Sequence, residues 1–145
     1  MKREFFLLLF LLLVSCSPSN NLDGPFNVTR VVDGDTFVLN TNEKVRISGI
    51  NTPEKKECYY EEAKQKLEKL TYGKEVYLEK DYSNKGKYGR LLRYVFVDNQ
   101  EVNFIMVQEG YAKVYDKYAY DTKKYSELKK VEQIARTQKL GVWNC

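Results

Sequence analysis

The stretch VVDGDTFVLNTNEKVRISGINTPE, from Val31 to Glu54, constrains the fold of this chain more than any other feature. Apolar and polar residues alternate along it, and Asp-Gly-Asp and Asn-Glu turns interrupt the alternation, which is typical of consecutive antiparallel strands. Because successive side chains of a strand point to opposite faces, Arg46 should lie on the face opposite its apolar neighbours Val45 and Ile47. The stretch therefore predicts a small sheet that holds an arginine between carboxylate-bearing turns.

The rest of the chain adds strands and then helices. Alternation predicts strands at FNVTRVV, from Lys74 to Tyr82, at RLLRYVFVD and, briefly, at YAKVY. Helical spacing predicts an amphipathic helix from about Cys58 to Thr71 and a short helix at VNFIMVQE that Gly110 ends. A loop, DKYAYDT, should precede a C-terminal helix that ends near Leu140-Gly141 and whose apolar stripe is Tyr125, Leu128, Val131 and Ile134.

About five strands with separate helices predict an α+β domain built on a small curled sheet or barrel. Five strands in a partly open barrel form the OB architecture, which commonly binds oligonucleotides. A chain of 145 residues needs only one such domain, and we assign residues 26–145 to it.

The N-terminus has the features of an export signal. Basic residues, an apolar run and small residues follow one another in residues 1–15, and the run is too short to span a bilayer comfortably. Its ending, Leu-Val-Ser-Cys, resembles a bacterial lipobox, in which Cys16 becomes the lipid-modified first residue; an ordinary cleaved signal is the alternative. Residues 16–25 then form a polar, lipid-attached tether. We expect an exported protein that is lipid-anchored to the bacterial cell envelope.

The remaining cysteines, Cys58 and Cys145, form either a disulfide or two free thiols. We expect the disulfide, because such bonds persist in exported proteins and this one would close a long loop. The chain has no histidine, which excludes Ser-His and Cys-His nucleophile pairs and His-containing zinc sites. Any catalysis must use carboxylates, arginines, lysines and tyrosines.

Several motif residues have both a structural and a chemical interpretation. Asp33 and Asp35 can simply form a hairpin turn with Gly34, or Asp35 can ligate a hard cation through oxygen. Arg46 and Arg90 can form surface ion pairs, and Glu54 can favour the start of a helix. Together, however, these residues supply a cation ligand, a base for water and two cations for phosphate oxygens, which are the parts needed to hydrolyse a phosphodiester.

Four motifs in series, DGDT, VRISGINTPE, KYGRLLRYVFVD and VNFIMVQEGYAKVY, closely resemble the staphylococcal nuclease (thermonuclease) family. The resemblance covers nearly all of the chain from Phe26 to Trp143. It implies an OB-type five-stranded β-barrel with about three helices. It also implies calcium-dependent cleavage of DNA and RNA that yields 3′-phosphate and 5′-hydroxyl ends.

The resemblance assigns roles by position. Asp35 and the backbone carbonyl of Thr52 would bind Ca²⁺, and Glu54 would be the general base. Arg46 and Arg90 would hold the phosphate and stabilise the five-coordinate transition state. Tyr88 and Tyr115 would contact the bound nucleotide, although this chain has 12 tyrosines and a packing role is the alternative.

The chain departs from the family pattern in two places. Asn51 stands where the family has a second calcium-binding aspartate, so one negative charge is lost and the cation should bind more weakly. Gly86-Lys87 replaces an acidic-basic pair before Tyr88. The nearby Lys80, Lys85, Lys87, Arg90 and Arg93 either hold a nucleic-acid backbone or form an ordinary solvated strand.

We therefore expect a monomeric, lipid-anchored nuclease with little sequence preference. The main alternative is a nucleic-acid-binding surface lipoprotein that has lost turnover. Such a protein would be expected to lack one or more of Asp35, Arg46, Glu54 and Arg90, and all four are present. A purely structural envelope lipoprotein would give no reason for this set.

Overall fold

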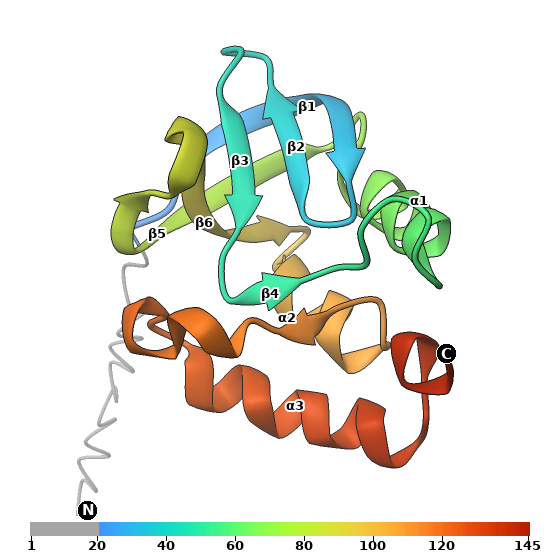
Figure 1. The fold of residues 1–145 in the computed structure, drawn as a ribbon. Helices are drawn as coiled ribbons and strands as arrows, with labels where there is room; N and C mark the ends of the chain where they lie inside the picture. The colour runs from blue at the N-terminus through green and yellow to red at the C-terminus, as the bar shows by residue number, and fades with distance from the viewer. Residues whose placement is uncertain (1–20) are drawn as a thin grey trace, which may run out of the picture.

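Five antiparallel and parallel strand pairings close a barrel at one end of the molecule (Figure 1). The structure is a computed structural model that describes residues 21–145; the expected signal peptide and the lipid-modified Cys16 lie outside the described residues. The barrel strands are β1 (Asp23–Asp33), β2 (Thr36–Leu39), β3 (Lys44–Ile47), β5 (Glu75–Lys85) and β6 (Leu91–Val97). This is the α+β, OB-type five-stranded barrel that the sequence predicts.

The parallel pairing of β3 with β6 closes the barrel. The sheet order is β3-β2-β1-β5-β6-β7, and β3 also pairs with β6 in the register Val45 with Leu91. This closing contact joins the motif around Arg46 to the segment that follows Arg90. Two-residue strands complete the sheets: β7 (Gln100–Glu101) extends the barrel sheet, and β4 (Ile50–Asn51) pairs with β8 (Lys113–Val114).

Three α-helices and three 3-10 segments occur within residues 21–145. The helix α1 (Tyr60–Thr71) packs on β1, whereas α2 (Val102–Gln108) lies between the barrel and α3 (Tyr125–Thr137) (Figure 1). The 3-10 segments are η1 (Lys87–Gly89), η2 (Asp116–Asp121) and η3 (Gly141–Asn144). No helix of this described part has the length and apolar character needed to cross a membrane.

Two helix predictions need correction. The helix α1 starts at Tyr60, not at Cys58. Tyr59 has a left-handed backbone angle φ of 73°, and a residue with this angle cannot be part of a right-handed α-helix. In α3 the predicted stripe is wrong at Ile134, whose side chain is 45% exposed, while Ala135 and Glu132 are buried. Glu132 is buried because its carboxylate accepts a 2.7 Å hydrogen bond from the Val114 N–H and pairs with the Lys129 ammonium.

The predicted loop DKYAYDT is also more regular than expected, since it contains η2. Its tyrosines therefore occupy defined positions between β8 and α3.

A buried amide joins α2 to the barrel. Asn103 is fully buried; its Oδ1 accepts a hydrogen bond from the Val95 N–H at 2.9 Å, and its Nδ2 donates to the Ser48 carbonyl at 2.8 Å. Ser48 directly follows β3. The buried amide of Asn103 therefore holds the backbone between Arg46 and β4 against β6.

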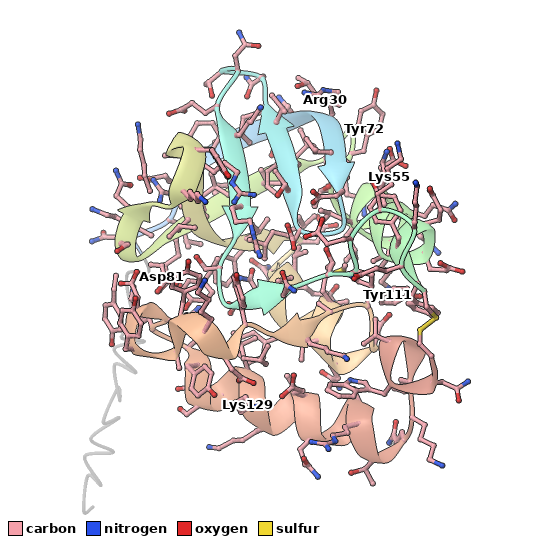
Figure 2. All side chains as sticks on the ribbon, in the orientation of Figure 1. Arg30, Lys55, Tyr72, Asp81, Tyr111 and Lys129 are labelled. Carbon is pink, nitrogen blue, oxygen red and sulfur yellow. A yellow bond between two sulfur atoms is a disulfide. The ribbon has the colours of Figure 1, made fainter. Side chains whose placement is uncertain are left out.

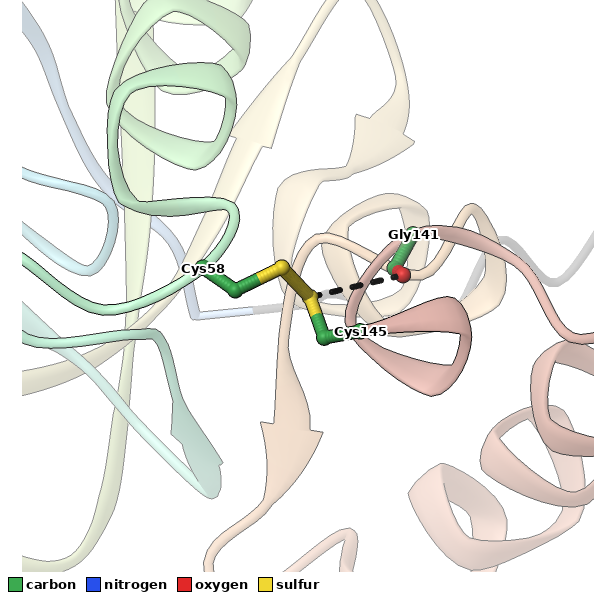
Figure 3. Close-up of a disulfide and its surroundings, with 3 residues drawn as sticks. All are labelled: Cys58, Gly141 and Cys145. Carbon is green, nitrogen blue, oxygen red and sulfur yellow. Dashed lines mark hydrogen bonds between the residues drawn. A yellow bond between two sulfur atoms is a disulfide. The ribbon is translucent and has the colours of Figure 1, made fainter.

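Cys58 and Cys145 form a disulfide across 87 positions of sequence (Figure 3). The bond ties the C-terminal residue to the segment between Glu54 and α1. Near it, η3 packs closely on the chain after α2, because the Val142 N–H donates to the Gly110 carbonyl at 2.8 Å.

Candidate active site

A single cavity of about 590 Å³ contains most of the predicted site residues. Asp35, Arg46, Asn51, Glu54, Tyr88, Arg90 and Tyr115 all line it. Thr52 is buried directly behind Asp35. Residues that are far apart in the sequence are thus brought together by β2, β3, β4 and the segments that precede β6 and follow β8.

Asp35 is held rigidly at the end of the first hairpin. Its Oδ2 accepts hydrogen bonds from the Thr52 N–H at 3.1 Å and the Thr52 hydroxyl at 3.0 Å, and its Oδ1 accepts one from the Thr36 hydroxyl at 3.0 Å. Only a glycine fits at position 34, because a Cβ there would lie 2.8 Å from the Thr52 side chain. The carboxylate is therefore fixed by the turn and by its neighbours before any ligand arrives.

Arg46 is buried with its guanidinium between two backbone carbonyls and the carboxylate of Asp35. Its Nη1 donates to the carbonyls of Ile47 at 2.7 Å and Ile50 at 2.8 Å, and its Nη2 lies 3.4 Å from Asp35 Oδ2. The side chain is on the face opposite Val45 and Ile47, as the alternation predicts. The two carbonyls fix Nη1, and Nη2 faces both Asp35 Oδ2 and Asn51 Oδ1.

Asn51 lies beside this group. Its Oδ1 is 3.4 Å from Arg46 Nη2, and the residue is exposed on the two-residue strand β4. The amide oxygen therefore faces the same part of the cavity as the Asp35 carboxylate.

Glu54 projects into solvent from the turn after Pro53. Its N–H donates to Glu57 Oε2 at 2.7 Å, which fixes the backbone of the turn. Within the described residues, the Glu54 carboxylate has no hydrogen-bond or ion-pair partner. It is an accessible acceptor for a proton from water.

Arg90 and Tyr88 form the opposite wall. Arg90 Nη1 lies 3.5 Å from the Thr36 hydroxyl, and the guanidinium carbon is 5.9 Å from the centre of the Tyr88 ring. Tyr88 is 82% exposed and Arg90 is half-buried, so neither side chain is part of the hydrophobic core. Tyr115 is half-buried, and its ring centre lies 5.8 Å from the guanidinium carbon of Arg46.

The donor atoms around Asp35 fit a hard cation. All candidate ligands are oxygens, namely the carboxylate of Asp35, the amide oxygen of Asn51 and, nearby, the carboxylate of Asp33. Burial raises the pKa of Asp33, and the negative charge of Asp35 raises it further. A cation bound between the two carboxylates would reduce the repulsion between them. Within residues 21–145, no three acidic, Cys or His side chains are grouped so that they could hold a metal ion by themselves.

Our sequence reasoning missed part of the cavity lining. Ser48, Asp81, Tyr118, Tyr120, Asp121 and Thr122 also line the cavity. Tyr118 and Tyr120 belong to DKYAYDT, where nothing distinguished them from the other tyrosines. The one available signal was their position shortly after the YAKVY motif.

Asp81 anchors the segment that carries these tyrosines. One of its oxygens, Oδ1, accepts hydrogen bonds from the Lys123 N–H at 2.8 Å and from the Tyr94 hydroxyl at 3.2 Å. Burial strongly raises the pKa of Tyr94, so this phenol stays protonated as a donor. Asp81 belongs to β5, and Figure 2 shows it beside the segment that precedes α3. The link fixes the end of η2 to the barrel.

Comparison with known proteins agrees with this geometry. A sequence profile described as staphylococcal nuclease homologue matches residues 44–145, which is most of the chain. The chain belongs to the staphylococcal nuclease family. The matched residues include Arg46, Asn51, Thr52, Glu54 and Arg90, whereas Asp35 lies just before them.

Several curated relatives carry nuclease names. The chain is 38% identical to the SPbeta prophage-derived endonuclease YokF of Bacillus subtilis (strain 168) over 125 residues, which are 79% of this chain and 42% of that protein. It is 31% identical to an uncharacterized endonuclease of Haemophilus influenzae over 141 residues, 94% of this chain and 74% of that protein. It is 31% identical to the thermonuclease of Staphylococcus intermedius over 145 residues, 85% of each chain.

The staphylococcal nuclease domain of this chain thus spans less than half the length of YokF but most of the length of the thermonuclease. The family profile covers β3, β5 and β6 of the barrel and most of the residues that line the cavity.

Proposed function

We propose that the protein is a calcium-dependent nuclease that hydrolyses phosphodiester bonds in DNA and RNA and leaves 3′-phosphate and 5′-hydroxyl ends. One observation carries the proposal: the cavity brings Glu54, the two arginines and the oxygen ligands around Asp35 together. Family membership and the nuclease names of the relatives support it.

Each group has one task in this mechanism. Arg46 and Arg90 hold non-bridging phosphate oxygens and stabilise the negative charge that grows on them. The Glu54 carboxylate takes a proton from water as the water oxygen bonds to phosphorus. The bond from phosphorus to the 5′-oxygen then breaks, the 5′-oxygen takes a proton from solvent water and leaves as a hydroxyl, and Glu54 returns its proton to solvent.

Asp35, Asn51 and the carbonyl of Thr52 would hold Ca²⁺, with Asp33 close by. When bound, Ca²⁺ neutralises charge on the phosphate and makes bound water more acidic. Because Asn51 provides no negative charge, we expect weaker affinity than a site with two carboxylate ligands would have.

A calcium titration tests both the activity and the cost of Asn51. Residues 21–145 are incubated with heat-denatured DNA while free calcium is raised from chelator to millimolar levels. The cleavage rate should rise with calcium. Asn51→Asp should lower the free calcium concentration at half-maximal cleavage, the calcium midpoint, by about tenfold, since it gives the site a second carboxylate ligand. The matched control is Asn99→Asp, which changes an exposed turn residue away from the cavity.

The same titration distinguishes the nuclease from the alternative function. If the protein binds DNA but cleaves it at no calcium concentration, it is the non-catalytic surface binder. A midpoint that Asn51→Asp leaves unchanged would show that position 51 does not ligate the cation.

We further propose that the protein is exported and lipid-anchored to the bacterial cell envelope through Cys16. The lipobox-like ending supports this, and the Cys58–Cys145 disulfide is typical of an oxidising compartment. Bacteria grown with a labelled fatty acid should incorporate the label into the full chain, and Cys16→Ala should abolish the label and release the protein from the membrane fraction. Equal labelling of both chains would contradict the lipid assignment.

A further inference from the structure

Arg93 is a buried arginine on β6 whose charge has no carboxylate partner. The residue is only 7% exposed, and no carboxylate of residues 21–145 lies within ion-pair distance of its guanidinium. Burial lowers the pKa of Arg93, and the more distant charges of Asp23 and Glu43 offset this effect only in part. Because taking an unpaired charge out of water costs free energy, arginines are seldom buried in this way. Stability alone therefore does not account for this residue.

The Arg93 guanidinium holds one residue of the neighbouring strand with two hydrogen bonds. Its Nη1 donates to the Asn84 carbonyl at 3.1 Å, and its Nη2 donates to Asn84 Oδ1 at 2.9 Å. Nη1 also donates to the carbonyl of Leu92 at 2.8 Å, next to Arg93 itself. The planar fork of a guanidinium suits two acceptors on one residue, whereas a lysine ammonium has no such geometry. The contact therefore fixes both the backbone and the side chain of Asn84.

Asn84 ends a bulge in β5 that the strand pairing does not fix. The pairing of β5 with β6 is regular as far as Lys80 opposite Arg93, and it resumes at Lys85 opposite Leu91. Four residues of β5, 81–84, thus lie opposite the single residue Leu92. A bulge interrupts the ladder of hydrogen bonds between two strands. Arg93 lies where the regular pairing stops, and its side chain holds the far end of the bulge.

The bulge leads directly into one wall of the active-site cavity. Lining residues of this wall are Lys85, Gly86, Lys87, Tyr88 and Arg90. The Gly86 N–H donates to the Arg90 carbonyl at 2.9 Å, which closes the connection between β5 and β6. A Cβ at Gly86 would lie 3.1 Å from the Leu92 side chain, so the connection also packs closely on β6. The position of Asn84 therefore sets the course of the backbone that carries Arg90.

The Arg90 side chain has few contacts of its own that would hold it in place. Its Nη1 lies 3.5 Å from the Thr36 hydroxyl, and its Nε lies 3.4 Å from the Lys87 carbonyl, both of which are long for hydrogen bonds. Within the described part of the chain, Arg90 forms no ion pair. The guanidinium is thus free to bind phosphate, but its placement depends on the backbone beneath it.

We propose that Arg93 is a positioning residue for Arg90. By holding Asn84, it fixes the connection between β5 and β6 so that the Arg90 guanidinium is in place before the phosphate arrives. Groups fixed in advance stabilise the charge of the transition state without a cost of reorganisation. Arg93 itself does not line the cavity, so it is neither a phosphate ligand nor part of an ordinary solvated strand. The inference rests on the proposed function, because it explains how one arginine of that site is placed.

A double-mutant cycle with Arg90 tests this role. Arg93→Met removes the guanidinium but keeps a long, unbranched side chain, and single-turnover cleavage of labelled single-stranded DNA at saturating calcium should slow by about 10- to 100-fold. In an Arg90→Ala background, where the group to be positioned is absent, Arg93→Met should slow cleavage by less than about twofold. A residue that acted independently of Arg90 would slow cleavage by the same factor in both backgrounds.

The melting temperature separates positioning from a purely structural role. Replacing a buried charge with an apolar side chain is often neutral for stability, so Arg93→Met should change the melting temperature by less than about 4 °C. A purely structural residue would behave in the opposite way, with a lower melting temperature and an unchanged cleavage rate. That result would overturn the proposal.

Two substitutions of Asn84 test the same contact from its other side. Asn84 is exposed, so its variants should fold even if Arg93→Met does not. Asn84→Ala removes the Oδ1 acceptor and should slow cleavage by about three- to tenfold, again only when Arg90 is present. Asn84→Asp keeps an acceptor oxygen and should retain the rate within about twofold. Arg30→Met is the matched control: it removes one positive charge from an exposed position on β1 that does not line the cavity, and it should cleave normally.

The outcomes are distinct for the two proposals. Equal slowing by Arg93→Met with and without Arg90, or unchanged cleavage by both Arg93→Met and Asn84→Ala, would overturn the positioning role while the unchanged protein still cleaved DNA. If Arg93→Met failed to fold, unchanged cleavage by Asn84→Ala alone would overturn it. An unchanged protein that cleaved DNA at no calcium concentration would instead overturn the proposed function.

Discussion

Replacing Glu54 with glutamine should lower the rate of DNA cleavage at saturating calcium by about a thousandfold. Glutamine has nearly the same shape but cannot accept a proton at neutral pH, so the change removes the base and little else. The Glu54 side chain is exposed and has no partner among residues 21–145, and its bonds to Glu57 are made by its backbone N–H and carbonyl. The free energy of unfolding should therefore stay within about 0.5 kcal/mol of that of the unchanged protein.

Glu61→Gln is the control for this experiment. Glu61 is an exposed glutamate in the first turn of α1 and does not line the cavity, so its variant should cleave DNA normally. The measurement is single-turnover cleavage of labelled single-stranded DNA, with DNA affinity measured separately. A Glu54→Gln protein that retained more than about a tenth of the rate would show that another group takes the proton.

The sequence is informative about this site because its main residues have strong local signals. Strand alternation places Arg46 on the correct face, and the Asp-Gly-Asp and Thr-Pro-Glu turns locate Asp35 and Glu54. What alternation does not reveal is how Arg46 is held. The carbonyls of Ile47 and Ile50 turn toward its guanidinium only because the chain bends between β3 and β4.

The two errors in the helix predictions also come from tertiary contacts that the local sequence does not show. The start of α1 depends on the left-handed backbone of Tyr59, which is set by tertiary structure and not by the propensity of tyrosine. In α3, hydrophobicity favours Ile134 over Glu132 for the buried face, but hydrogen bonds to Val114 and Lys129 make the buried carboxylate acceptable.

The part of the cavity lining that comes from η2 was not predictable from local patterns. Tyr118, Tyr120 and Asp121 lie in a segment without helical or strand periodicity in the sequence. Long-range contacts place this segment at the cavity, among them the hydrogen bond from the Lys123 N–H to Asp81. Asp81 and Lys123 are 42 positions apart. Contacts over such separations decide which of many tyrosines face a ligand, and no short window of sequence contains them.

Removing the disulfide with the double substitution Cys58→Ser and Cys145→Ser should lower the free energy of unfolding by about 4 to 5 kcal/mol. A cross-link over 87 positions restricts the unfolded chain, and the loop-closure relation gives this magnitude for a loop of that length. For a domain of this size, the loss corresponds to a fall in melting temperature of roughly 10 to 20 °C. Thermal and urea unfolding of residues 21–145 measure both quantities.

The disulfide also affects the site, because it holds the segment that begins just after Glu54. Cys58 lies four positions beyond Glu54 and is bonded to Cys145 (Figure 3). Cys145 directly follows η3, whose Trp143 ring lies beside the charged groups of Lys113 and Arg136. Reduction of the unchanged protein should therefore reproduce the stability of the double variant, and the double variant should not respond to reductant. If the two proteins had the same melting temperature under oxidising conditions, the disulfide would not stabilise the protein by restricting the unfolded chain.

A double variant that lost stability but kept full activity at 25 °C would show that the Glu57 carboxylate, through its bond to the Glu54 N–H, positions the base without help from the disulfide.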